Sequence, residues 1–264
     1  MVDPVELRTL AESAARAAGA LLLSGLDEVR TDVQTKSTGT DMVSEMDRAA
    51  EACIVEWLLG ARPDDGIVGE EGTDLSGSSG VVWVVDPLDG TTNYLYGLSG
   101  FGVSIAAAVD GVVVAGVVLD VVRGEMFAAT LGGGATRDDR PIRASTATRL
   151  ATALIATGFS YEAERRARQA AVLLQVLPQV RDIRRFGAAA VDLCSVACGR
   201  VDGYYERGLA AWDLAAGGLI AAEAGAVVTA FDGGPAAAGS VVAAAPGIAA
   251  SLLELVVTAG AAEA

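Results

Sequence analysis

The chain has 264 residues, a hydrophobic fraction of 52% and a formal net charge of −15, so it can bury a large core but has no excess of basic residues for binding nucleic acid or anionic membranes. It contains no histidine, which excludes Ser-His-Asp and Cys-His catalysis, phosphoryl transfer through histidine, and zinc sites with histidine ligands.

The N-terminal region and the cysteines indicate the cellular compartment of the protein. No basic segment leads into an apolar stretch after Met1, and no apolar run has the length of a membrane span. Cys53, Cys194 and Cys198 lack metal-site spacing and favour a reducing compartment. We therefore expect a cytoplasmic protein.

The first half of the chain predicts helices followed by an antiparallel sheet. Asp3-Pro4 with Glu6 is typical of a helix start, and the apolar spacing predicts a helix over residues 4 to 24. A second helix is predicted from about Ser44 to Gly60, with a polar loop or hairpin from Thr35 to Asp41 before it. Residues 72 to 80 are expected to form a surface loop. Short β-branched runs predict strands over residues 81–85, 101–109, 112–119 and 125–130, and Asp110-Gly111 is a hairpin turn.

Strands and helices alternate in the second half. Strands are predicted over residues 153–157, 182–186, 201–205, 226–231 and 240–244, and helices over 161–177, 188–198 and 212–224, with a final helix after them. We therefore expect an α/β (α+β) architecture with an antiparallel N-terminal sheet and a mixed C-terminal sheet. We place the two halves at residues 1–148 and 149–264.

The strongest chemical signal is Asp86-Pro87-Leu88-Asp89-Gly90-Thr91-Thr92, which follows an apolar strand. Pro87 disfavours helical geometry at Asp86, so we expect a turn that directs Asp86, the Leu88 carbonyl and Asp89 into a common space. Oxygen ligands without histidine favour Mg²⁺, Mn²⁺ or Ca²⁺ over zinc. The N–H groups of Gly90-Thr91-Thr92, at an expected helix start, would attract phosphate oxygens. Taken alone, the first five residues are equally typical of an ordinary capped turn.

Two other acidic motifs add to this signal. Gly69-Glu70-Glu71 ends an apolar stretch, and Trp212-Asp213 begins an Ala-rich helix. Surface acids and helix capping explain each motif taken alone. Beside the Asp86 turn, a glutamate would instead bridge a cation and orient a water molecule.

Together with the segment from Lys36 to Asp47 and with Tyr204-Tyr205-Glu206, these motifs resemble the inositol monophosphatase family, within the lithium-sensitive, magnesium-dependent phosphatases that include fructose-1,6-bisphosphatases. The motifs follow in the family's order along most of the chain. The resemblance implies a layered α-β-α-β-α sandwich of the sugar phosphatase type and a homodimer. It also implies hydrolysis of a small phosphate monoester, such as myo-inositol monophosphate, with two or three Mg²⁺ ions, with Mn²⁺ as a substitute and Li⁺ as an inhibitor. We expect no nucleic acid or membrane partner.

The resemblance also implies individual roles. The metal ligands would be Glu70, Asp86, the Leu88 carbonyl, Asp89 and Asp213. Glu70 and Thr91 would orient and deprotonate the attacking water, with assistance from Asp47. Substrate contacts would come from Asp89, Gly90, Thr91, Ala189, Glu206 and Asp213. Lys36 and Asp41 would belong to a mobile active-site loop.

Several positions leave the substrate open. Tyr96 and Ser99 stand where related sequences often carry His and Pro, and Ala210-Ala211 replaces larger residues before the Trp-Asp pair. Thr92, where members dedicated to histidinol phosphate often have Lys, favours the inositol branch. Fructose 1,6-bisphosphate, histidinol phosphate or another sugar phosphate remain alternative substrates, and a non-catalytic dimeric binding module is an alternative function.

Three charged residues have two interpretations each. Glu206 accepts hydrogen bonds from ring hydroxyls by resemblance, or is a solvated acid after a strand. Arg184 and Arg185 approach a phosphate or a neighbouring subunit, or form a charged strand end.

Overall fold

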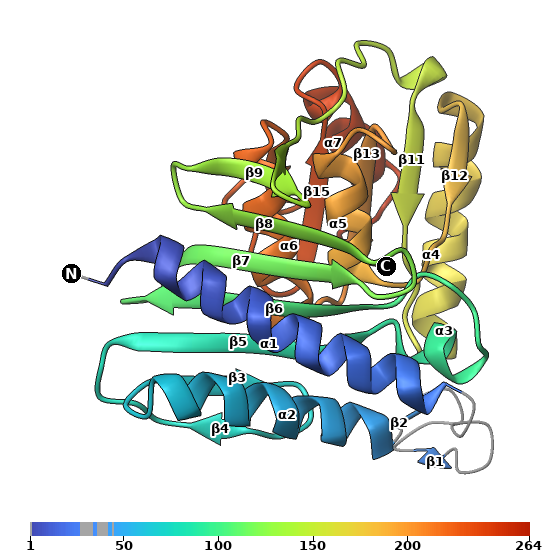
Figure 1. Cartoon of the computed structure of the whole chain (residues 1–264). Helices are drawn as coiled ribbons and strands as arrows, with labels where there is room; N and C mark the ends of the chain where they lie inside the picture. Colours follow the sequence, from blue (N-terminus) through green and yellow to red (C-terminus); the bar gives the residue numbers. More distant parts are fainter. Residues whose placement is uncertain (1, 27–33, 36–41, 44) are drawn as a thin grey trace.

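Two β-sheets and the helices that cover them form the computed structural model of the chain, which describes residues 2–26, 34–35, 42–43 and 45–264 (Figure 1). The layers follow the order α-β-α-β-α, as expected. One sheet has eight strands and the other has five, and a separate pair of short strands, β1 (Gln34–Thr35) and β2 (Met42–Val43), lies beside them. The β1–β2 pairing is antiparallel, and the loop or hairpin predicted from Thr35 to Asp41 lies, apart from Thr35, outside the described residues.

The eight-stranded sheet has the order β10-β9-β8-β7-β6-β5-β3-β4. Neighbouring strands of this sheet pair antiparallel, except for β3 and β5, which pair in parallel. The parallel pair arises because β4 turns back along β3, so the chain enters β5 at the end where β3 begins. The strands are β3 (Gly66–Gly69), β4 (Asp74–Leu75), β5 (Val81–Asp89), β6 (Gly102–Val109), β7 (Val112–Asp120), β8 (Glu125–Thr130), β9 (Gly134–Arg137) and β10 (Arg140–Pro141).

The five-stranded sheet is mixed, as predicted, with the order β12-β11-β13-β15-β14. The pairs β12–β11 and β11–β13 are parallel, and the other two pairs are antiparallel. Its strands are β11 (Leu154–Thr157), β12 (Asp182–Arg184), β13 (Gly203–Arg207), β14 (Val227–Thr229) and β15 (Ser240–Ala244).

Helices cover both sheets. On the outer face of the large sheet lie α1 (Pro4–Gly25) and α2 (Glu45–Ala61), while α5 (Ala189–Ala197) and α6 (Ala211–Glu223) fill the layer between the sheets (Figure 1). The far face of the small sheet packs against α4 (Ala163–Val176) and α7 (Ala249–Thr258). The short segments α3 (Thr91–Leu95), η2 (Leu150–Thr152) and η3 (Leu177–Gln179) complete the described helical elements.

Small residues allow the layers to approach closely. A Cβ at Gly116 on β7 would lie 3.0 Å from the backbone of Ala216 on α6, so glycine permits this close approach without a shift of the helix. The high Ala and Gly content therefore serves close helix-to-sheet packing.

At the N-terminus of α1 the Asp3 Oδ1 accepts a hydrogen bond from the Val5 N–H at 2.8 Å, as its capping sequence predicts.

Three local predictions were wrong or incomplete. Residues 72–80 are not only loop, because β4 lies within them. The strands β9 and β10 were not predicted. The expected turn after Val85 is part of β5, which continues to Asp89 with a shift in register between Asp86 and Asp89. Pro87 has no N–H for the ladder, so the chain forms an irregular stretch of strand there.

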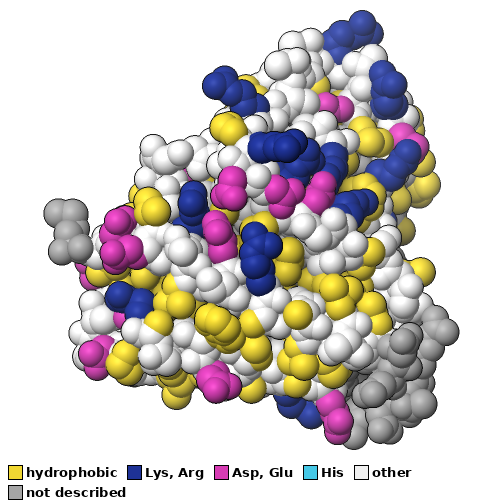
Figure 2. Space-filling view, in the orientation of Figure 1, with side chains coloured by type: hydrophobic (Ala, Val, Ile, Leu, Met, Phe, Trp, Pro, Cys, Tyr) yellow, Lys and Arg dark blue, Asp and Glu magenta, His cyan; other side chains and the backbone are white. Residues whose placement is uncertain are grey.

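The surface carries side chains of both charges. On the face shown in Figure 2, basic side chains are most frequent in the upper half, with acidic side chains among them. Within the described ranges, no helix combines the length and the apolar character that crossing a membrane requires. The three cysteines are free thiols. The proposed boundary between residues 148 and 149 stays a prediction.

Candidate active site

The irregular end of β5 presents two carboxylates. The Asp86 Oδ1 accepts a hydrogen bond from the Leu88 N–H at 3.0 Å, and the Leu88 carbonyl accepts one from the Thr91 hydroxyl at 3.1 Å. Asp86 is 1% exposed and Asp89 is 6% exposed, so both carboxylates are buried at the end of the strand.

Asp89 joins β5 to a helix from the second half of the chain. Its carboxylate accepts hydrogen bonds from the N–H groups of Ala189 at 3.0 Å, Ala190 at 2.7 Å and Val191 at 3.4 Å. These are the first N–H groups of α5, which have no partner within the helix. The N-terminus of α5 is therefore bound to Asp89, and Ala189, a predicted substrate contact, lies there.

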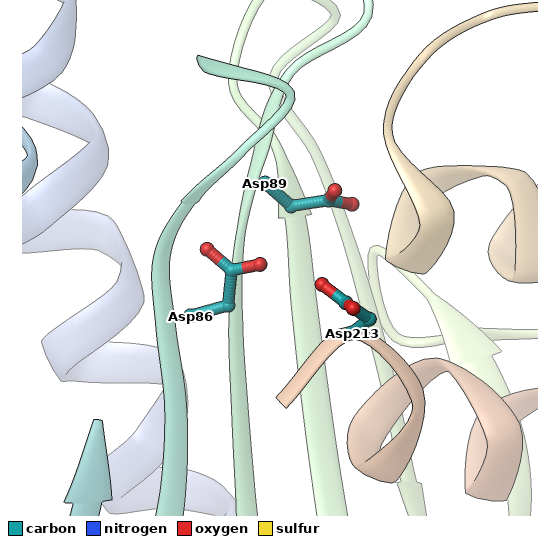
Figure 3. A group of neighbouring side chains, drawn as sticks. All are labelled: Asp86, Asp89 and Asp213. Carbon is teal, nitrogen blue, oxygen red and sulfur yellow. The ribbon is translucent and has the colours of Figure 1, made fainter. Parts of the chain in front are cut away.

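Asp213 completes a group of three carboxylates. It lies in the first turn of α6, and its Oδ2 accepts a hydrogen bond from the Ala210 N–H at 2.6 Å. One oxygen from each of Asp86, Asp89 and Asp213 lies within 4.8 Å of the others, and Figure 3 shows the carboxylates turned toward one another.

Glu70 lies next to this group. Its backbone N–H donates to the Val85 carbonyl at 3.1 Å, which fixes the chain after β3 against β5. The Glu70 and Asp86 carboxyls are close enough for each to shift the pKa of the other, and both line the same cavity. The residue that was expected to bridge a cation thus touches the carboxylate cluster.

Burial raises the pKa values of these four acids, and repulsion between negative charges adds to the effect at three of them. Burial is the main cause for each: it raises the pKa of Glu70 to about 7, of Asp89 to about 8 and of Asp213 to about 6, and it raises that of Asp86 well above its usual range. The neighbouring negative charges add to the effect at Glu70, Asp86 and Asp89. A divalent cation among these oxygens would offset the repulsion, and oxygen donors suit Mg²⁺ or Mn²⁺, so the residues present fit such an ion.

A cavity of about 410 Å³ opens over the carboxylate cluster. Arg185, Ala210 and residues 159–162 contribute to its walls. Among the residues expected to act on metal, water or substrate, those that line it are Glu70, Asp86, Leu88, Asp89, Gly90, Thr91, Ala189, Glu206 and Asp213. The structure therefore brings together residues from both halves of the chain around one space.

Glu206 lies at the end of β13 in the wall of this cavity. Its Oε2 accepts a hydrogen bond from the Tyr204 hydroxyl at 2.5 Å. Burial raises the pKa of Glu206 to about 7, while the Tyr204 hydrogen bond and the charge of Arg185 act in the opposite direction. Glu206 is thus a half-buried, partnered acid, unlike a solvated one.

Other predicted residues lie elsewhere. Asp47 is buried in the first turn of α2 and is not among the described residues that line the cavity, although its charge contributes to the raised pKa of Glu70. Arg184 is exposed and pairs with Asp182 at 2.5 Å, which makes it the charged strand end. Lys36 and Asp41 lie outside the described residues.

Not all of the positions that depart from the family pattern lie in the wall of the cavity. Ala210 lines the cavity, whereas Tyr96 and Ser99 are not among its described lining residues. Tyr96 is 60% exposed. Of these departures, only that at Ala210 therefore changes a described residue in the wall of the cavity.

Sequence reasoning missed three residues near the site. Tyr161 and Arg165, from the region before and within α4, line the cavity. Glu51 on α2 is 4% exposed and holds the chain around Glu70. Glu51 lies one helical turn after Asp47 on the same buried face, which is the one sequence signal that indicated it.

The fold and the cluster define a layered α/β protein with a candidate metal centre where its layers meet. A model of the inositol monophosphatase family matches residues 3–261. The chain is 48% identical to the inositol-1-monophosphatase of Mycobacterium leprae, over 95% of this chain and 93% of that protein. It is 44% identical to the Nus factor SuhB of Pasteurella multocida, over 92% of this chain and 93% of that protein. The crystal structure of the extragenic suppressor protein suhB from Bartonella henselae has a TM-score of 0.90 and 38% identity, and the match covers 95% of this chain and 98% of that one.

The match to the family model covers nearly the whole chain, and the Mycobacterium leprae relative aligns with 95% of it. The protein therefore belongs to the inositol monophosphatase family.

Proposed function

We propose that this protein is a magnesium-dependent phosphatase that hydrolyses a small phosphate monoester, with myo-inositol monophosphate as its substrate. The observation that carries the proposal is the convergence of Asp86, Asp89 and Asp213 beside Glu70 in one cavity. Non-catalytic use of the fold would not require this buried group of like charges, which raises the free energy of the protein without a cation.

The proposed ligands for Mg²⁺ are Glu70, Asp86, the Leu88 carbonyl, Asp89 and Asp213. When bound, the cation supplies a Lewis acid that polarises the phosphoryl oxygens and lowers the pKa of water. We assign to Glu70 and Thr91 the orientation of the attacking water and the acceptance of its proton. The Thr91 hydroxyl donates a 3.1 Å hydrogen bond to the Leu88 carbonyl, which leaves its oxygen able to accept a hydrogen bond from water, and Thr91 lines the cavity.

The other cavity residues would bind the alcohol part of the ester. Glu206, fixed by Tyr204, is positioned to accept hydrogen bonds from ring hydroxyls. Gly90 and Ala189 line the same space, and Asp47 assists through its charge. The relative from Mycobacterium leprae is named an inositol-1-monophosphatase, which supports this substrate, while the name Nus factor SuhB of other relatives leaves it to be tested.

A sugar bisphosphate is the second candidate substrate. Arg165 and Arg185 both line the cavity and would attract a second phosphate group. Histidinol phosphate and other sugar phosphates have no comparable support from the described residues.

Phosphate release from inositol 1-phosphate, fructose 1,6-bisphosphate, histidinol phosphate and adenosine 3′,5′-bisphosphate, with and without Mg²⁺, tests both candidates. Mg²⁺-dependent release that is fastest from inositol 1-phosphate is the expected result. Faster release from the sugar bisphosphate would move the substrate to the second candidate. No release from any ester would contradict the phosphatase and favour the binding module. The homodimer and the cytoplasmic location stay predictions, the first testable by light scattering.

A further inference from the structure

The turn that carries Glu70 is held by one buried carboxylate from α2. The Glu51 Oε2 accepts a hydrogen bond from the Glu71 N–H at 2.9 Å. The Glu51 Oε1 accepts two more, from the Thr73 N–H at 3.1 Å and from the Thr73 hydroxyl at 2.6 Å. Both oxygens are therefore used to bind the chain directly after Glu70.

The same carboxylate also lies against the residue before Glu70. A Cβ at Gly69 would be 2.3 Å from the Glu51 Oε2, so glycine is required for the carboxylate to approach the backbone. The Gly69 N–H donates to the Thr73 carbonyl at 2.7 Å and closes the turn around Glu51. The backbone of residues 69–73 is thus wrapped around a single side chain.

This arrangement links Glu70 to α2. The Arg48 Nε lies 4.0 Å from the Glu71 Oε2, and Asp47 precedes Arg48 in the first turn of the helix. The Glu70 N–H bond to Val85 holds the turn to β5 from the other side. Glu70 is consequently placed between α2 and β5, with Glu51 as the main contact to the helix.

We propose that Glu51 is a positioning residue, which sets the place of the Glu70 carboxylate beside Asp86 and so determines the affinity of the site for a divalent cation. The inference rests on the proposed cation site. Mutating side chains that hydrogen-bond directly to metal ligands changes metal affinity or activity by about 10- to 100-fold. Glu51 acts one step further out, through the chain next to Glu70, so we expect the lower end of this range.

The test is a calorimetric titration of the metal-free protein with Mg²⁺, for wild type and for Glu51→Gln. The amide has one acceptor oxygen where the carboxylate has two, so either Glu71 or Thr73 loses its acceptor. We expect the dissociation constant for Mg²⁺ to rise about tenfold. Glu56→Gln is the matched control, because Glu56 is exposed on the same helix, and it should leave the constant unchanged.

Thr73→Val gives a second measurement that keeps the shape of the turn. It removes the hydroxyl donor at 2.6 Å, and we expect a smaller rise in the dissociation constant. The rise in the double variant Glu51→Gln/Thr73→Val should be less than the product of the two separate rises, because both changes act on one contact.

Thermal unfolding of each variant in chelator separates positioning from stability. A Glu51→Gln protein that unfolds at a lower temperature but binds Mg²⁺ as tightly as wild type would overturn the proposal, even if wild type is an active phosphatase. Wild-type protein that binds no Mg²⁺ would overturn it too. If no tested ester is hydrolysed but Glu51→Gln still weakens Mg²⁺ binding, the positioning role holds and only the proposed reaction fails.

Discussion

The carboxylate of Asp89 and the N–H of Ala190 lie 2.7 Å apart, although the two residues are 101 positions apart in the chain. This hydrogen bond joins the end of β5 to the start of α5. Together with the bonds to Ala189 and Val191, it places a candidate metal ligand at a helix N-terminus, where the helix dipole favours an anion. The cluster therefore forms only when both halves of the chain are packed.

Asp89→Asn should remove Mg²⁺ binding and turnover together. The substitution removes a ligand charge, and its amide NH₂ cannot accept hydrogen bonds from α5. We expect phosphate release to fall by roughly a hundredfold or more. The rise in Tm on adding Mg²⁺, which in wild type is a linkage effect of binding to the folded state, should also disappear.

Circular dichroism shows whether this variant is folded, and Asp182→Asn is its control, because Asp182 is exposed and pairs only with its neighbours. An Asp89→Asn protein with full turnover would contradict the assignment of the metal ligands.

The stability of the metal-free protein should depend on pH. Burial raises the pKa of Glu70 from 4.5 to about 7 and that of Asp89 from 3.8 to about 8. At a pH between the unfolded and the folded pKa of each group, the folded protein keeps a proton that the unfolded chain has released, so unfolding releases protons. The stabilising contribution is complete below about pH 4 and is lost as the pH rises toward about 8.

Thermal unfolding in chelator from pH 5 to pH 8.5 measures this effect. We expect Tm to fall with rising pH, and the increase in Tm caused by Mg²⁺ to grow, because the cation competes with the bound protons. The slope should be shallower in Glu70→Gln. A metal-free Tm that does not change over this range would show that the acids are not coupled to folding.

Arg185→Ala should weaken substrate binding, whereas Arg184→Ala should not. Arg185 lines the cavity and favours the ionised form of Glu206, but Arg184 pairs with Asp182 outside it. Loss of the Arg185 charge raises the pKa of Glu206 further. At neutral pH a smaller fraction of Glu206 is then ionised and able to accept hydrogen bonds with both oxygens. We expect KM for inositol 1-phosphate to rise about tenfold at pH 7.

The pH dependence of KM separates this role from direct phosphate binding. If Arg185 acts through Glu206, the difference between Arg185→Ala and wild type should decrease above about pH 8, where Glu206 is ionised in both. An equal difference at every pH would mean that Arg185 contacts the substrate itself.

Lithium should inhibit phosphate release. Membership of the inositol monophosphatase family implies this sensitivity, and the oxygen-only cluster of Asp86, Asp89 and Asp213 suits a small hard cation. The measurement is phosphate release at fixed Mg²⁺ with added Li⁺, with Na⁺ at the same concentration as the control for ionic strength. Equal rates in the two salts would place this protein apart from the lithium-sensitive members.

The sequence by itself determined the elements and the chemistry that depend on neighbouring residues. The α1 helix was predicted over residues 4 to 24 and extends from Pro4 to Gly25, because capping and apolar spacing act over a few residues. The absence of histidine and the order of the acidic motifs likewise restricted the site to oxygen ligands. These features require no knowledge of which distant segments pack together.

Only the tertiary structure decided how the motifs are held. It places Glu51 inside the turn after Glu70, turns β3 parallel to β5, and leaves Tyr96 outside the cavity. Asp89 gains its three N–H donors from α5, a helix on the other side of the layer interface. Such contacts depend on the packing of whole layers, and local patterns in a single sequence carry no information on which buried carboxylate meets which distant N–H group.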